Sequence, residues 1–215
     1  MNRYHLLLFL LLGILLFAAA IASCEDDDDD DSGGLSEGDD DSAMTDDDDN
    51  STPEPGDFVL TSSAFENLGD IPAKYTCDND NPDNGMSPPL AWENAPENTV
   101  SFAITVRDPD SPSGDTHHWG LINIPADVHS LDEGASPDGD LPEGSWQTLA
   151  YTDVAEYAGP CPPTDDGAHR YNFTLYALSQ EIPEPDEETP LSDVLGDLED
   201  ARIDSTTLTG RYNRD

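Results

Sequence analysis

Residues 107–119 read RDPDSPSGDTHHW and bring two carboxylates, Asp108 and Asp110, close to two imidazoles, His117 and His118. The whole chain of 215 residues has only five histidines. Asp before Pro stabilises a turn through side-chain hydrogen bonds, so DPD is first of all a turn between strands. The same carboxylates can orient the imidazole of His118 and raise its pKa, which makes the turn a candidate binding site.

A second polar segment, GPCPPTDDGAHRY at residues 159–171, adds His169, Arg170 and Tyr171. Its prolines exclude a helix or a central strand, and they remove the backbone donors that a phosphate cradle needs. Successive side chains of a strand alternate, so Arg170 need not face the same side as His169. We therefore favour His169 and Tyr171 as pocket residues, and predict a small polar pocket where the two segments meet.

The chain around these segments has the pattern of strands. From residue 100 to 107, Val, Phe, Ile and Val alternate with Ser, Ala, Thr and Arg, which predicts a half-buried strand that ends at the DPD turn. Residues 119–124 are a second apolar run, and Pro125 stops it. Residues 169–178 alternate as well, with His169 on the same side as Tyr171, Phe173 and Leu175.

One segment has the spacing of a helix. Thr189 and Pro190 are typical of a cap and first turn, and the apolar residues after them recur with the period of one buried face: Leu191, Val194, Leu195, Leu198 and Ala201. The sequence of residues 205–212 predicts a last strand. The fold class is therefore mostly β, a sandwich with short peripheral helices, one of them near the C-terminus.

The first 23 residues have the pattern of a secretory signal peptide, with Arg3 before an apolar run from Leu6 to Ala20. Small residues lead to Cys24, which resembles the lipobox of a bacterial lipoprotein; by that resemblance Cys24 is lipidated after cleavage. An ordinary cleaved signal with a chance cysteine is the alternative. We expect secretion across the inner membrane and lipid anchoring to the cell envelope, on its periplasmic or cell-surface side.

Residues 24–57 hold 17 Asp and Glu and no Lys or Arg, which predicts a disordered acidic tether. Calcium binding by the acidic runs is the alternative, but the runs lack the spaced ligands of a calcium loop. Residues 58–215, the predicted domain, still hold 31 acidic against six basic residues. This balance suggests a salt-rich habitat and argues against nucleic-acid binding, which depends on Lys and Arg.

Cys77 and Cys161 remain once Cys24 is assigned to a lipid. A secreted protein permits a disulfide, which would tie residues 75–84 to the pocket segment. The spacing in sequence says nothing about distance, so a disulfide and two free thiols both stay open.

Several motifs in this order resemble the phosphatidylethanolamine-binding protein (PEBP) family, in its bacterial YbhB/YbcL-type, Raf-kinase-inhibitor-like branch. They are YTCD, SPPLAW, DPDSP, HHW followed by NIP, GPCPP and HRYNFTLYAL, and the resemblance covers residues 58–214. It implies a β-sandwich with a pocket for phosphate-like or phospholipid head groups. The implied ligand-binding residues are Asp108, Asp110, His118, Gly159, Pro162, His169 and Tyr171.

The chain departs from the family pattern in two places. The loop after Cys77, residues 78–86, is longer than usual, and the helix after Pro190 carries Asp197, Glu199 and Asp200 where relatives tend to have a Gly-His pair. Both changes put the family's ligand preference in doubt for this chain.

Three functions compete. We favour an envelope-anchored binding protein for a small anionic or phosphorylated ligand, without cofactor or metal and not an enzyme. The resemblance also allows inhibition of a protease or kinase by binding. A metal-dependent hydrolase could use His117, His118, His169, Asp108 and Asp110, but adjacent histidines on a strand face opposite sides unless a bulge intervenes.

Overall fold

The computed structural model describes residues 54, 56–79, 85–137, 139–186 and 188–214. The predicted signal peptide, Cys24 and nearly all of the predicted tether lie outside these residues. Within the described part of the chain, no helix is both long and apolar enough to cross a membrane.

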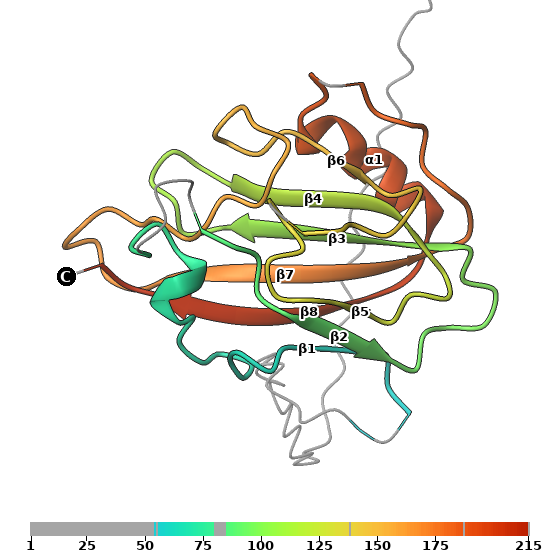
Figure 1. Cartoon of the computed structure of the whole chain (residues 1–215), viewed down its shortest axis with the longest axis horizontal. Coiled ribbons are helices and arrows are strands. Elements are labelled where there is room, and N and C mark those ends of the chain that lie inside the picture. Colours follow the sequence, from blue (N-terminus) through green and yellow to red (C-terminus); the bar gives the residue numbers. More distant parts are fainter. Residues whose placement is uncertain (1–53, 55, 80–84, 138, 187, 215) are drawn as a thin grey trace, which may run out of the picture. The chain divides into compact units, whose positions relative to one another are not determined.

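Two antiparallel sheets form the fold (Figure 1). The larger has the order β6 (Trp146–Gln147), β4 (Thr116–Pro125), β3 (Ser101–Asp108), β7 (His169–Leu178) and β8 (Arg202–Tyr212). The smaller has the order β1 (Val59–Thr61), β2 (Leu90–Glu93) and β5 (Ser130–Leu131). One 3-10 turn, η1 (Ala73–Tyr75), and one α-helix, α1 (Leu191–Ala201), complete the described elements. The mostly β fold with a helix near the C-terminus is confirmed.

The main core lies between the two sheets. Phe102, Ile104 and Val106 of β3 are fully buried in it, as their alternation predicted. Trp92 of β2 packs edge-on against Phe102, with ring centroids 5.5 Å apart. Large apolar side chains from both sheets thus exclude water from the interior, which is the main source of stability in such a fold.

The prediction that the first long strand is half-buried was wrong. Ala103 and Thr105, on the opposite face of β3, are also fully buried. The cause is α1, whose apolar face packs on that side together with Ile182 and gives the sheet a second core. Val100 lies outside the strand and is 49% exposed.

The buried face of α1 is as predicted, with Leu191, Val194, Leu198 and Ala201 inside. The predicted cap was wrong, because Pro190 occupies the N-cap position and no side chain caps the helix. The hydroxyl of Thr189 instead donates to Asp186 Oδ1, at 2.7 Å. The helix leads directly into β8, which begins three residues before the predicted start of the last strand.

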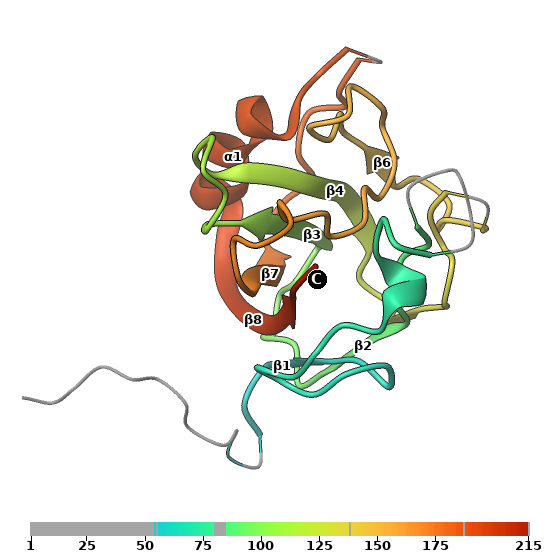
Figure 2. The ribbon, with the colours of Figure 1, turned by 90° about the vertical axis from the view of Figure 1, so that its left-hand side faces the viewer.

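One end of the larger sheet gathers the polar segments. β3 ends at Asp108, paired with Thr116 at the start of β4, and β7 begins there with His169, paired with Tyr212 near the end of β8. Figure 2 looks onto this end, where the C-terminus also lies. Strands that are distant in sequence therefore bring the DPD turn and the HRY segment together.

Candidate functional site

A pocket of about 200 Å³ opens at this end of the sheet. Its walls are Asp108, Ser111, Pro112, Ser113, Thr116, His118, Tyr151, Cys161, Pro162, Pro163 and His169. The predicted meeting of the two polar segments is thus observed. Four of the seven predicted site residues line the pocket, namely Asp108, His118, Pro162 and His169. Asp110, Gly159 and Tyr171 do not.

His118 lies at a β-bulge. Val106 pairs with Trp119 and Arg107 pairs with His117, so His118 is the extra residue of β4. Bulges of this kind redirect a side chain, and here the ring of His118 reaches the pocket. His117 does not line the pocket, although the bulge removes the strict alternation that would separate the two histidines.

The ring of His118 is held by a backbone carbonyl. Nδ1 lies 2.8 Å from the carbonyl oxygen of Ala158, and a carbonyl only accepts, so Nδ1 carries the proton. The ring packs edge-on against Tyr171 at 5.2 Å and contacts Tyr151 at 4.8 Å between centroids. Burial lowers the pKa of His118 more than Ala158 and Asp108 raise it. The imidazole is therefore neutral, with Nε2 as the ring nitrogen left to accept a hydrogen bond.

The expectation that Asp108 or Asp110 orients His118 was wrong, and although the charge of Asp108 raises the pKa of His118 as expected, burial outweighs it and the net shift is downward. Asp108 instead binds His169, with Oδ2 2.8 Å from Nδ1. The reason is the register of the sheet, which places the end of β3 beside the start of β7. Asp108 Oδ1 also accepts a hydrogen bond from the backbone N–H of Asp110 at 2.9 Å. One oxygen of Asp108 therefore holds the turn and the other holds His169.

His169 has a carboxylate at each ring nitrogen. Nε2 lies 3.4 Å from Asp166 Oδ2, opposite the contact with Asp108. Burial lowers the pKa of His169, but hydrogen bonds and charges from Asp108 and Asp166 outweigh it, so the net shift is upward. An imidazole between two acceptors is most stable with both nitrogens protonated. The carboxylates therefore favour the cationic form of His169, in contrast to His118.

Asp110 faces Arg170 rather than the pocket. Its carboxylate accepts from the backbone N–H, Nε and Nη2 of Arg170 at 2.8, 2.9 and 2.6 Å. The hydrogen bonds from Arg170 lower the pKa of Asp110 to about 2. The side chain of Arg170 is 54% exposed, consistent with the preference for His169 over Arg170 as the pocket residue.

Tyr171 and Gly159 lie behind the lining. Tyr171 is fully buried and supports the ring of His118; its hydroxyl makes no hydrogen bond of good geometry among the described residues. Burial, and then the nearby charge of Asp108, raises the pKa of Tyr171. Gly159 is buried in the loop after Ala158. Both shape the pocket without facing it.

Sequence reasoning missed Tyr151. No motif surrounds this residue; its position depends on a hydrogen bond from its backbone N–H to the His117 carbonyl oxygen, at 2.8 Å, which lays the loop across β4. The hydroxyls of Ser111, Ser113 and Thr116 were also missed, although they belong to the quoted 107–119 stretch. Hydroxyl groups beside the DPD turn were the available signal, because they can donate to a small anion.

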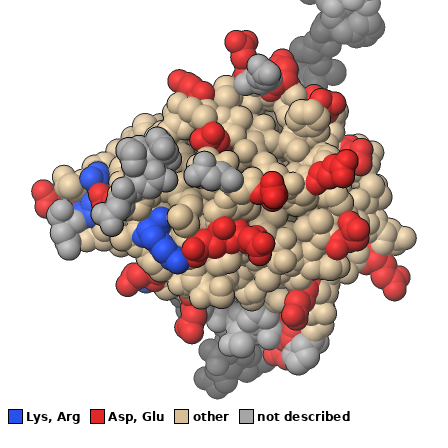
Figure 3. Space-filling model, in the orientation of Figure 1, with Lys and Arg blue, Asp and Glu red and all other residues tan. Residues whose placement is uncertain are grey.

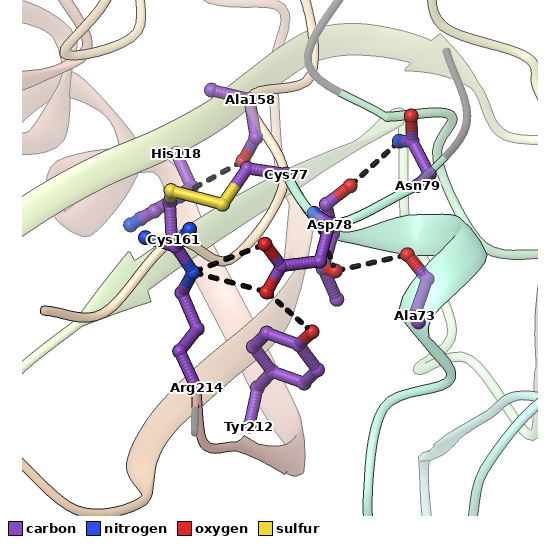
Figure 4. The surroundings of a disulfide bond; sticks show 10 residues. Ala73, Cys77, Asp78, Asn79, His118, Ala158, Cys161, Tyr212 and Arg214 are labelled. Carbon is purple, nitrogen blue, oxygen red and sulfur yellow. Dashed lines mark hydrogen bonds and ion pairs between the residues drawn. A yellow bond between two sulfur atoms is a disulfide. The ribbon is translucent and has the colours of Figure 1, made fainter. Parts of the chain in front are cut away.

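A disulfide closes one wall of the pocket. Of the two states left open for Cys77 and Cys161, the structure has the bonded one, with Cα atoms 5.4 Å apart (Figure 4). The backbone N–H of Cys77 also donates to the Pro160 carbonyl oxygen at 3.1 Å. Next to it, Asp78 accepts hydrogen bonds from Tyr212 and Arg214. The wall is therefore joined both to the η1 segment and to the end of β8.

The surface around the sandwich is acidic. On the face shown in Figure 3, Asp and Glu are scattered widely, and the few visible Lys and Arg lie toward the end where β3 finishes. No group of three or more His, Cys, Asp or Glu among the described residues is arranged to hold a metal ion.

Fold and pocket together define a class, the β-sandwich binding proteins with a small polar pocket at a sheet end. Residues 61–213 match the family described as phosphatidylethanolamine-binding protein. A UPF0098 protein of Methanothermobacter thermautotrophicus is 40% identical over 156 residues, 72% of this chain and 98% of that protein. UPF0098 protein YbcL of Escherichia coli is 39% identical over 129 residues, 59% of this chain and 64% of that protein.

Solved structures agree with the sequence comparison. The crystal structure of E. coli YbcL, described as a member of the mammalian PEBP family, matches with a TM-score of 0.68 and 32% identity, over 74% of this chain and 99% of that one. A PEBP homologue from Chlamydia trachomatis, CT736, matches with a TM-score of 0.65, 32% identity and the same coverage. The chain belongs to the phosphatidylethanolamine-binding protein family, and the resemblance to its YbcL-type branch is confirmed.

Proposed function

We propose that this protein is an envelope-anchored binding protein that captures a small anionic ligand, a phosphate or a phospholipid head group, in the pocket between the DPD turn, His118 and the GPCPP segment. One observation carries the proposal: two buried histidines from different strands meet in one pocket with different partners, His118 on a backbone carbonyl and His169 between two carboxylates. The carboxylates raise the pKa of His169 and favour it as a charged donor, whereas burial lowers the pKa of His118 and favours it as an acceptor at Nε2. The pair suits an oxyanion that keeps one proton, or a head group that carries an ammonium.

The size and lining of the pocket support this choice. A volume of about 200 Å³ lies below the usual range for drug-sized ligands, and it suits a phosphate or a head group. Ser111 and Ser113, whose hydroxyls lie 3.0 Å apart and hydrogen-bond each other, add polar groups to the lining. Cys161, the one cysteine in the lining, is in a disulfide and is no nucleophile. On this proposal the protein acts by binding its ligand.

Calorimetric titration of the full-length protein in high salt tests the pocket. Phosphate, phosphoethanolamine and phosphoserine are compared on the wild type and on a His118→Ala/His169→Ala double variant. The matched control is His129→Ala, because His129 is exposed and lies outside the pocket. We expect saturable binding that the double variant loses and the control keeps. Absence of heat from a folded wild-type protein would contradict the proposal.

Envelope anchoring rests on the sequence of residues 1–24 and has its own test. Cells expressing the protein are fed a labelled fatty acid, and the label should enter the wild type but not a Cys24→Ser variant. Release of the wild-type protein into the soluble fraction without label would remove the anchoring part of the proposal and leave the pocket untouched.

A further inference from the structure

The outer ring nitrogen of His169 is already occupied by the protein itself. Oδ2 of Asp166 lies 3.4 Å from Nε2, while Asp108 holds Nδ1 on the other side. The family resemblance assigns no role to Asp166, and it is not among the residues that line the pocket. We propose that Asp166 is a specificity-determining residue. In the free protein its carboxylate occupies the position at His169 that the ligand takes, and an anionic ligand displaces it on binding; we call this carboxylate the latch.

Asp108 and Asp166 differ in how firmly they are held. The side chain of Asp108 is 4% exposed and is fixed by His169 and by the backbone N–H of Asp110. The side chain of Asp166 is 48% exposed, and its backbone N–H makes one long hydrogen bond, 3.4 Å to the Pro163 carbonyl oxygen. Asp108 is therefore a permanent partner of His169, whereas Asp166 can move away at low cost.

The loop has room for this movement. Residues 163–168 are all exposed. Asp165 and Gly167, on either side of Asp166, have positive φ angles of 69° and 86°, and a Cβ on Gly167 would meet nothing within 4 Å. Side chain and backbone of Asp166 can therefore turn outward without a clash, and of the loop only Pro163, at its start, belongs to the walls of the pocket.

The charges around His169 define which ligands can open the latch. One imidazolium faces two carboxylates, so a ligand anion that entered beside Asp166 would meet net negative charge. An anion that replaces the Asp166 carboxylate leaves the net charge around His169 unchanged and accepts the hydrogen bond that Nε2 gave to Asp166. A cationic or neutral ligand gains nothing from the exchange. The ligand class is thus a small molecule with a carboxylate or phosphate group, and this conclusion rests on the proposed function of the pocket.

Two variants of the full-length protein test the latch. Asp166→Asn removes the charge at His169, and the matched control Asp165→Asn removes the same charge one residue earlier, at a position whose positive φ asparagine tolerates. We expect Asp166→Asn to tighten binding of inorganic phosphate about two- to fivefold, the scale of an exposed ion pair, and Asp165→Asn to leave it near the wild type. Calorimetry at fixed salt gives both affinities.

Histidine NMR on the ligand-free proteins gives a second readout. Loss of Asp166 should lower the pKa of His169, while Asp165→Asn should not. Equal phosphate affinities for the two variants, with wild-type binding present, would overturn the latch and leave the proposed function standing. No phosphate binding by any of the three proteins would remove the proposed function and the latch with it. Weaker binding by Asp166→Asn would show that Asp166 holds the ligand instead of competing with it.

Discussion

The two sides of the pocket are held by different forces. On the His118 side, the ring binds the Ala158 carbonyl, the Ala158 N–H binds the His118 carbonyl oxygen, and the following loop is joined to Cys77 by the disulfide. On the His169 side, the contacts are ion pairs with Asp108 and Asp166. The pKa of the same residue type is consequently lowered in one place, by burial, and raised in the other, by carboxylates.

The pocket therefore combines a side held by backbone hydrogen bonds and a covalent bond with a side held by charges. The backbone and covalent contacts do not themselves depend on protonation, so the His118 side should respond to reduction, and to pH only below about 6.5, where the imidazole can take up a proton. Carboxylate contacts depend on protonation and, where exposed, on salt. Four experiments test whether the two sides differ in this way.

The largest effect is expected on the His118 side. A Cys77→Ser/Cys161→Ser variant frees a loop whose ends are 84 residues apart in sequence, which should cost about 4 kcal/mol of unfolding free energy. Urea denaturation measures the loss. Reducing agent should destabilise the wild type to the same degree and leave the variant unchanged. The pKa of His169 should stay at its wild-type value; a parallel change there would show that the two sides are not separate.

On the His169 side, Asp108→Ala should cost about 3 kcal/mol, because it leaves a buried imidazolium without its partner. Denaturation in urea at pH 6 measures this cost. Asp108→Asn keeps the size of the side chain and one acceptor oxygen, so it should be milder in stability but should still lower the pKa of His169. A wild-type pKa for His169 in both variants would refute the assignment of Asp108 as its partner.

The pH dependence of stability should have opposite signs at the two histidines. The folded-state pKa of His169 is raised, so its contribution is complete below the ordinary value near 6.5 and is lost as pH rises through the folded pKa. The folded-state pKa of His118 is lowered, so its contribution is complete above about 6.5 and is lost as pH falls. Histidine NMR titration should resolve one resonance on each side of 6.5. If His118 and His169 both titrated above 6.5, or both below it, the contrast between the two histidines would be contradicted.

The smallest effect on stability is expected for Arg170→Ala, because Arg170 belongs to neither the His118 side nor the His169 side of the pocket. This exposed ion pair with Asp110 should change the unfolding free energy by less than about 1 kcal/mol. The pKa of Asp110 should rise from about 2 toward its ordinary value, and carboxyl NMR follows that change. Phosphate affinity should remain within about twofold of the wild type. A large loss of affinity would place Arg170 in the binding site.

Local patterns predicted much of the fold and part of the site. Period-two alternation located β3 and β7, and the apolar spacing located the buried face of α1. His118 and His169 were found because polar residues cluster near strand ends. Patterns failed where a partner was distant in sequence. The local pattern of β3 does not show that α1 will cover its second face, and the pattern of β4 does not show that the 150–156 loop will bring Tyr151 to it.

By itself the sequence determined which residues form strands, which face of the helix is apolar, and which two segments carry the polar groups of the site. These are local properties, because backbone preference and hydrophobic period act over a few residues. Only the tertiary structure decided that Asp108 belongs to His169, that Asp110 belongs to Arg170, that Cys77 reaches Cys161, and that Asp166 covers the outer nitrogen of His169. Sheet register brings the end of β3 beside the start of β7 and so pairs Asp108 with His169, whereas the loops place Cys77, Cys161 and Asp166; neither is fixed by preferences that act over a few residues.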